Sequence, residues 1–179
     1  KKYIKIVIKY LYIMKIVVTG GNGMVGSCIK DVIKYYEPEF GKHEFVFLNR
    51  SLNDSLSVDL TRLIEVEDFF SKNDFDAIIH LAADVGGLYK NLHQNVEMFH
   101  NNIMINENVL SACYKNNIHK GIFILSSCIY PCEPSKFPMD ETMIHESPPH
   151  YSNEGYAYSK RMMHLQCKNY NKNYNTDYT

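Results

Sequence analysis

The sequence predicts an α/β fold built on one doubly wound parallel sheet, and three observations predict it. Short β-branched runs of four or five residues recur along the chain. Longer amphipathic stretches separate these runs, and a glycine-rich turn joins the first run to the first stretch. Strand and helix patterns that alternate in this order require parallel pairing with right-handed crossovers.

Each expected strand is a short apolar run bounded by polar or turn residues. The helix after the first strand ends before Pro38, because proline cannot continue a helix. The next helix repeats apolar side chains every three or four positions. The expected strands are residues 15–19, 44–48, 77–81 and 122–125, with a further strand offered by the tail after Asn169, and the expected helices are residues 24–36, 63–72, 95–116 and one from Tyr156, after a polar loop over 128–155.

Composition indicates one globular domain. The 179 residues are 45% hydrophobic and 22% charged, enough for a real core. The net charge of −1 lacks the basic excess that nucleic-acid binding needs, so we expect no nucleic-acid partner. Five cysteines without paired spacing indicate reduced intracellular thiols, and hence a cytoplasmic protein.

Residues 1–13 (KKYIKIVIKYLYI) are expected to be an extension, because Met14 directly precedes the first strand. A secretory signal is disfavoured, since Lys5 and Lys9 interrupt the apolar run and no small-residue cleavage site follows. The stretch is also too short and too charged to span a membrane, so we expect no membrane association. The domain is therefore expected to cover residues 14–179.

The string TGGNGMVG, after the first strand, predicts a dinucleotide site of the Rossmann type. It reads as G-x-x-G-x-x-G on Gly20, Gly23 and Gly26, or as G-x-G-x-x-G from Gly21. The turn needs backbone angles that a side chain opposes, and a pyrophosphate must closely approach the amides at the helix N-terminus. A strand–turn–helix context strengthens the pattern, and a glycine turn without a ligand is the alternative.

The end of the second strand favours NADP over NAD. An NAD site carries a carboxylate there for the ribose hydroxyls, whereas this chain has Asn49, Arg50 and Ser51. A guanidinium suits a 2′-phosphate, although a solvated surface arginine is the alternative. Asp59 and Leu60 are candidates for the adenine edge, with a helix cap as the other role for Asp59.

Tyr156 and Lys160 form a Y-x-x-x-K motif that lies on one helical face. A free tyrosine titrates near pH 10, and a cation one turn away lowers the pKa of its phenol toward the working range. Ser126 follows the fourth strand, at the edge where a nicotinamide belongs, and can hydrogen-bond a substrate carbonyl. An ordinary Tyr–Lys pair on a surface helix is the alternative.

These motifs resemble the extended short-chain dehydrogenase/reductase family and, within it, the GDP-4-keto-6-deoxy-D-mannose epimerase-reductases. The HLAADVGG and SSCIYP strings are specific, whereas the glycine turn places only the superfamily. The resemblance covers the chain from Met14 onward. Its strings are TGGNGMVG (19–26), HLAADVGG (80–87), NNIMINENVL (101–110), SSCIYP (126–131), PMDETMIHESPPH (138–150) and GYAYSKRM (155–162).

The resemblance implies an enzyme that epimerises C3 and C5 of GDP-4-keto-6-deoxy-D-mannose and then reduces C4 with NADPH to give GDP-L-fucose. Ser126, Tyr156 and Lys160 match the reduction set, with Tyr156 as the proton donor to O4. Cys128 matches the position of the family's epimerising cysteine. A thiol suits this step, because it titrates near 8.5 and can exchange protons near neutrality. A small buried cysteine is the alternative.

The same resemblance implies two sets of binding residues and a homodimer formed through the helices over 95–116 and 156–170. The cofactor set is Gly20, Gly23, Met24, Val25, Gly26, Arg50, Asp59, Leu60, Leu81, Ala82, Ala83 and Lys160. The GDP-sugar set is Val85, Gly86, Gly87, Ser126, Ser127 and Cys128.

Two features depart from the family pattern. The family's histidine partner for Cys128 and its GDP-sugar region lie beyond Thr179, so we expect this chain by itself to be inactive and to lack the C-terminal substrate domain. Asn22 stands in the glycine turn where some relatives carry a basic residue for the NADP phosphate. That departure leaves the phosphate to Arg50.

Other interpretations stay open. A sugar-nucleotide 4-epimerase needs no cysteine, and a 4,6-dehydratase would carry Asp-Glu where this chain has Ser127 and Cys128. A non-catalytic NADP-binding module usually loses the tyrosine or the lysine.

A Cys/His group, His80 and Asn106 also carry expectations. The spacing of Cys128, Cys132, His145 and His150 matches no known zinc pattern, so we expect no metal. His80 is expected to be a packed strand residue. Asn106 is a candidate to bond backbone near the active site and orient Lys160 through water, with a solvated helix asparagine as the alternative.

Overall fold

The computed structural model describes residues 13–50 and 56–179. The expected extension therefore lies outside the described residues except for Ile13, as does Ser51. Within the described residues, five parallel strands form one sheet in the order β2-β1-β3-β4-β5. The strands are β1 (Lys15–Thr19), β2 (Glu44–Leu48), β3 (Ala77–His80), β4 (Lys120–Phe123) and β5 (Asp177–Tyr178).

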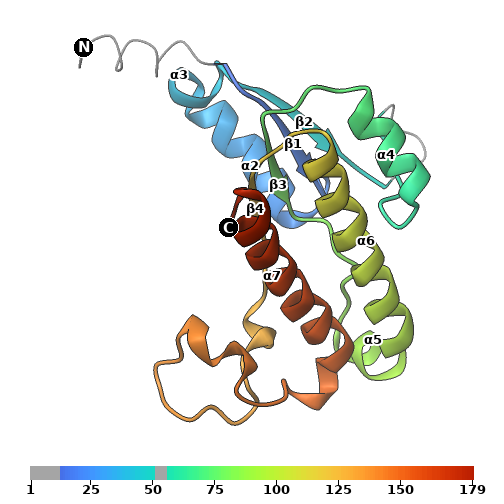
Figure 1. The fold of residues 1–179 in the computed structure, drawn as a ribbon, viewed down its shortest axis with the longest axis vertical. Helices are drawn as coiled ribbons and strands as arrows, with labels where there is room; N and C mark the ends of the chain where they lie inside the picture. The colour runs from blue at the N-terminus through green and yellow to red at the C-terminus, as the bar shows by residue number, and fades with distance from the viewer. Residues whose placement is uncertain (1–12, 51–55) are drawn as a thin grey trace.

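The helices cover the sheet in two layers (Figure 1). The step from β1 to β2 runs opposite to the later steps across the sheet, so right-handed crossovers place α2 on one face and α4, α6 and α7 on the other. The helices are α2 (Met24–Tyr35), α3 (Glu37–Phe40), α4 (Leu63–Ser71), α5 (Leu88–His93), α6 (Asn95–Lys115) and α7 (Glu154–Tyr174), with 3₁₀ turns η1 (Ser127–Ile129), η2 (Glu141–His145) and η3 (Tyr151–Asn153).

The predicted doubly wound parallel sheet is confirmed. The strand order reverses between β1 and β3, and the crevice outside the carboxyl ends at such a point is where open α/β sheets bind ligands. The main core lies between the sheet and the layer of α4, α6 and α7. Its central residues include Val17, Leu48, Ile78, Phe70, Val109 and Met163.

Strand pairing moved one expected boundary. The apolar run at 122–125 predicted the fourth strand, but β4 begins at Lys120 because Gly121 pairs with Ile78 of β3. A Cβ on Gly121 would come within 2.7 Å of the Ile78 side chain, so this position accepts only glycine without a shift. The predicted strand in the tail is confirmed by β5, which pairs in parallel with β4.

Two helices were missed by the sequence patterns. α3 begins next to Pro38, which ends α2 as expected but also suits the first turn of a new helix. α5 has no buried residue, and it exposes Leu88 and Tyr89, so no core-facing apolar stripe marks it. The last helix, α7, begins at Glu154 rather than at Tyr156.

Candidate active site

The glycine turn is shaped by close backbone contact with the loop after β3. Gly20 has a φ of 72°, and a Cβ there would lie 2.9 Å from the Ala82 nitrogen. A Cβ on Gly26 would lie 2.7 Å from the carbonyl oxygens of Gly20 and Gly21. Both positions therefore require glycine, and the second lets α2 start against the turn.

The N-terminus of α2 is open. Its N-cap is Gly23, which makes no side-chain capping bond, and the first turn contains no acidic residue. The first amides of a helix have no intrahelical partner and carry the positive end of the helix dipole. The amides that begin α2 at Met24 and Val25 can therefore bind an anion such as a pyrophosphate.

A cavity of about 600 Å³ runs from this turn across the carboxyl ends of the strands. Except for Lys160, every residue that the sequence assigned to the cofactor lines it. Val85 and Tyr156 line it as well. The cavity also includes residues that the motifs did not assign, namely Leu48, Asn49, Val58, Thr61, Asp84, Asn101, Ile105 and Ile124.

The charged end of this cavity holds Arg50 and Asp59. Arg50 is exposed at the end of β2. Asp59 accepts bonds from the Thr61 amide and hydroxyl, and it does not cap α4, whose N-cap is Arg62. Burial raises the pKa of Asp59, but the bonds from Thr61 and the charges of Arg50 and Arg62 outweigh burial and hold the pKa below its usual value.

Asn22, the departure in the glycine turn, accepts a hydrogen bond from the Lys30 ammonium at 3.0 Å. That ammonium also lies 4.9 Å from the centre of the Phe47 ring on β2. A basic group from α2 therefore stands beside the turn, although Lys30 does not line the cavity.

A second, smaller cavity of about 290 Å³ adjoins the catalytic candidates. Of the predicted substrate set, only Gly87 does not line it. Gly87 is the N-cap of α5. Tyr156 lines both cavities and so stands where they meet. The lining residues are Val85, Gly86, Asn91, Met98, Ser126, Ser127, Cys128, Asn153 and Tyr156.

Ser126 and Cys128 are coupled at the end of β4. The Ser126 hydroxyl caps η1 by accepting the Cys128 amide at 3.4 Å, and the Cys128 thiol donates to the same oxygen at 3.2 Å. The thiol is half-buried. The short 3₁₀ turn thus places a hydroxyl and a thiol side by side at the cavity.

Lys160 is buried beneath the site, only 2% exposed, and its ammonium donates to the Ile124 carbonyl at 2.8 Å. Burial lowers the pKa of Lys160 to about 8. The ammonium lies 6.0 Å from the centre of the Tyr156 ring. The lysine bonds to backbone instead of the phenol, and it lines neither cavity.

The pKa of Tyr156 differs from the expected direction. Burial raises it, the neighbouring Cys128 raises it further, and a hydrogen bond with Ser126 lowers it in part. The expected lowering by Lys160 is therefore not seen in this structure. The physical reason is that desolvation dominates when the lysine's charge is turned toward Ile124.

His80 is a packed strand residue, as expected. It is fully buried, and its ring bonds the Thr19 hydroxyl at 2.8 Å and the Asn106 carbonyl oxygen at 3.3 Å. Burial and the charge of Lys160 lower its pKa to about 3, so His80 is neutral near pH 7. Asn106 is 1% exposed and donates to the Ser159 carbonyl at 3.4 Å, so the alternative of a solvated asparagine is wrong.

Other binding classes leave little trace in residues 13–50 and 56–179. No group of three or more His, Cys, Asp or Glu side chains there could hold a metal ion. No helix in the same ranges is long and apolar enough to cross a bilayer. All five cysteines are free.

Several residues at the two cavities had no sequence signal. Asn91 and Asn153 come from an exposed helix and a 3₁₀ turn, and neither belongs to a recognisable spacing. Asp84 and Asn101 lie inside strings that carry the resemblance, but nothing in the strings marks their contact. Proximity of this kind arises only when distant segments fold together.

Known proteins match the chain over nearly its whole length. The model of the NAD dependent epimerase/dehydratase family matches residues 16–179. A GDP-L-fucose synthase of Dictyostelium discoideum is 43% identical over 164 residues, and a probable GDP-L-fucose synthase of Drosophila melanogaster is 39% identical over 165 residues. Each match covers 92% of this chain and 49% of the relative, so the chain spans about half the length of these relatives.

A solved structure gives the same result. The GDP-L-fucose synthetase from Naegleria fowleri, bound to NADP, superposes with a TM-score of 0.77 at 33% identity, over 92% of this chain and 47% of that one. The resemblance expected from the sequence strings is therefore confirmed. With a family model matching from the first strand to the last residue, the chain belongs to the NAD dependent epimerase/dehydratase family.

Proposed function

We propose that residues 14–179 form the NADP-binding unit of a cytoplasmic enzyme that converts GDP-4-keto-6-deoxy-D-mannose to GDP-L-fucose. One observation carries the proposal. Tyr156 stands where a dinucleotide-sized cavity meets a second cavity that holds the Ser126 hydroxyl and the Cys128 thiol. The likeness to proteins named GDP-L-fucose synthase supports the choice of substrate.

The residues at the first cavity fit NADP. The Gly20 and Gly26 contacts would exclude any side chain from the turn, so a pyrophosphate could approach the open N-terminus of α2. Arg50 would pair with the 2′-phosphate, and Asp59 and Leu60 would border the adenosine. When bound, NADPH supplies the hydride for the reduction of C4.

For that reduction, Ser126 and Tyr156 would bind the C4 carbonyl oxygen, and the Tyr156 phenol would donate the proton as the oxygen gains charge. Lys160 would act from below. Its positive charge would favour the phenolate left behind only after the ammonium turns from the Ile124 carbonyl toward the phenol. The bond to Ile124 holds α7 at the end of β4.

For epimerisation, the 4-keto group acidifies the hydrogens on C3 and C5. A base removes the proton from one face of each carbon, and an acid returns a proton to the other face. Cys128 would be one of these two groups, because a thiol can donate a proton and its thiolate can accept one. Its hydrogen bond to Ser126 places the sulfur beside the carbonyl-binding hydroxyl.

The test is to incubate the whole natural protein that contains this chain with NADPH and GDP-4-keto-6-deoxy-D-mannose, and to identify the product. GDP-L-fucose is expected. Tyr156→Phe should abolish reduction but leave exchange of solvent deuterium into C3 and C5, and Cys128→Ser should abolish that exchange. Reduction without exchange in the natural protein would indicate a simple 4-reductase, and no turnover at all would contradict the proposal.

A further inference from the structure

Three asparagine side chains near the smaller cavity share an unusual state. Among the described residues, the side-chain oxygens of Asn91, Asn95 and Asn153 are shielded from solvent and accept no hydrogen bond. A buried carbonyl oxygen without a donor is destabilising, and the great majority of such groups in folded proteins have a partner. A ligand that brings hydrogen-bond donors would supply the missing partner.

Two of the three amides belong to the cavity itself. Asn91 and Asn153 line it together with Ser126, Cys128 and Tyr156, whereas Asn95 does not line it. The torsion that turns an asparagine amide is broad and soft. Rotation about this torsion would turn the oxygen of each lining amide toward a bound group.

The lining of the smaller cavity indicates the chemistry of that group. No Lys, Arg, Asp or Glu side chain lines it, so it lacks the charges that would hold a phosphate or a cation. Its volume of about 290 Å³ is near the lower limit of small-molecule sites, about 300 Å³. A neutral ring that carries hydroxyl groups fits this size and this set of acceptors.

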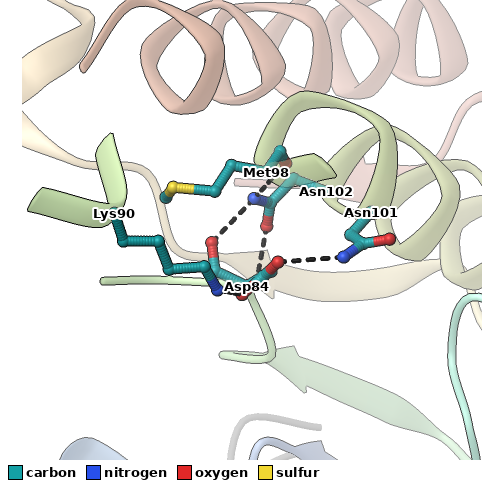
Figure 2. A network of polar contacts seen from close by, with 5 residues as sticks. All are labelled: Asp84, Lys90, Met98, Asn101 and Asn102. Atoms are coloured by element: carbon teal, nitrogen blue, oxygen red, sulfur yellow. Dashed lines mark hydrogen bonds and ion pairs between the residues drawn. The ribbon is translucent and has the colours of Figure 1, made fainter. Parts of the chain in front are cut away.

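A polar network ties α5, the helix that contains Asn91, to the loop after β3 and to α6 (Figure 2). Lys90 directly precedes Asn91 on α5. Its ammonium pairs with the carboxylate of Asp84, which follows β3. The same carboxylate accepts the Asn101 amide at 2.9 Å. Asn102 accepts the Asp84 backbone N–H and donates to its carbonyl, both at 2.8 Å, so α6 anchors both the loop and α5.

Burial raises the pKa of Asp84, but the hydrogen bonds from Lys90 and Asn101 and the charges of Lys90 and Arg50 outweigh burial and hold the pKa below its usual value. Asp84 is therefore ionised near pH 7, and its pair with Lys90 ties α5 to the loop after β3. Asn153 faces the same space from η3, where its backbone N–H donates to the His150 carbonyl at 3.2 Å.

We infer that Asn91 and Asn153 accept hydrogen bonds from two hydroxyl groups of the substrate's sugar ring and so orient the ring over Ser126, Cys128 and Tyr156. The inference rests on the proposed function for the identity of the sugar. It adds two residues that determine specificity, each from a segment without a sequence motif. Asn95 provides the matched control, because it is an equally unpaired amide that does not line the cavity.

The first measurement is kinetic, on the whole natural protein. Asn91→Ala and Asn153→Ala should each raise the KM for GDP-4-keto-6-deoxy-D-mannose about fivefold to tenfold, since one net hydrogen bond is lost. The Kd for NADPH should stay within twofold. Asn95→Ala should leave both constants within twofold, and a KM shift of the same size in Asn95→Ala would overturn the inference.

The second measurement separates this inference from the proposed function. Titration calorimetry with GDP-L-fucose and with GDP isolates the contribution of the sugar ring to affinity. Asn91→Ala and Asn153→Ala should reduce this contribution, and Asn95→Ala should not. Suppose that the two variants lose the sugar contribution but the natural protein does not turn over the 4-keto substrate. That result would contradict the proposed function and leave the inference about Asn91 and Asn153 intact. An unchanged or absent sugar contribution would overturn the inference, whatever the activity.

Discussion

At the residue scale, the site depends on polar side chains that burial holds in fixed hydrogen bonds. Thr19 shows how this is done, because its hydroxyl accepts the Ala82 amide at 3.1 Å and bonds the His80 ring. The strand that ends in the glycine turn thereby also holds the loop after β3. His80 passes the connection on to Asn106, and Asn106 reaches the backbone beside Lys160.

His80 should make stability depend on pH. The unfolded chain binds a proton near pH 6.5, but the folded protein does not bind it until about pH 3. Stability is therefore fully present above pH 6.5 and falls as the pH drops through this window, by about 1.4 kcal/mol per pH unit for one proton. Urea unfolding at pH 7, 6 and 5 measures the slope.

The matched pair for this measurement is His80→Gln and His93→Gln, the second at an exposed position of α5. His80→Gln should flatten the slope between pH 6.5 and 5, and His93→Gln should leave it unchanged. If both variants keep the wild-type slope, the buried His80 ring does not cause the pH dependence of stability.

Arg50 should set the cofactor preference. A charge-assisted bond to a 2′-phosphate contributes about 1.5–3 kcal/mol, so Arg50→Ala should weaken NADPH binding about tenfold or more and NADH binding less than twofold. Fluorescence titration of both cofactors measures this. Arg62→Ala is the control, because Arg62 pairs with Glu65 and does not line the cavity. Equal losses for NADPH and NADH would remove the reason for preferring NADP.

At the scale of elements, α6 connects the site to the rest of the fold through three buried asparagines. Asn102 bonds the backbone of Asp84, Asn106 bonds the Ser159 carbonyl, and Asn108 donates to the Leu60 carbonyl at 3.0 Å. Each bond reaches a segment that borders a cavity. A mostly apolar helix would pack as well against the sheet, but it would lack the bonds to the loop backbones at Asp84 and Leu60 and the bond to Ser159 of α7.

Asn102→Ala should be destabilising, because the fully buried Asn102 amide is the partner of both the part-buried N–H and the carbonyl of Asp84. We expect a loss of about 2 kcal/mol in the free energy of unfolding. Asn101→Ala removes one partly exposed bond to the Asp84 side chain, so its loss should stay below about 1 kcal/mol. Urea denaturation compares the two, and equal losses would contradict the special role of Asn102.

At the scale of the whole molecule, the outer surface of α6 and α7 carries exposed apolar side chains. Val96 and Phe99 on α6, and Met162 and Leu165 on α7, are each at least 41% exposed. The two helices also lie against each other, with the Gln166 amide bonded to Glu107. These features support the proposal that the two helices pair with those of a second copy.

Leu165→Glu should convert this proposed homodimer to a monomer, because it would desolvate a carboxylate without a partner in the interface. Light scattering on the size-exclusion peak gives the mass. Val32→Glu on α2, an exposed apolar position on the opposite face, should leave the mass unchanged. A wild-type protein that is monomeric at all concentrations would contradict the dimer.

Local patterns in the sequence were enough to predict the overall architecture. Strand and helix periods predicted the parallel sheet, and the glycine turn predicted the helix N-terminus that can bind a pyrophosphate, because both patterns are local. The close approach of this turn to Ala82 was not predicted, since it joins segments far apart in the chain. Strand ends were less secure. The start of β4 at Lys120 was missed, since pairing with β3 extends a strand beyond its apolar run.

By itself, then, the sequence determined the fold class, the order of the elements and the catalytic candidates Ser126, Tyr156 and Lys160, because periodicity and motif spacing are local properties. Cys128 became a candidate through the family resemblance. Only the tertiary structure decided that Asn91 and Asn153 meet at one cavity, that Lys160 bonds to backbone instead of the phenol, and that the pKa of Tyr156 is raised. These results depend on burial and on contacts between segments far apart in the chain, and neither leaves a pattern in sequence.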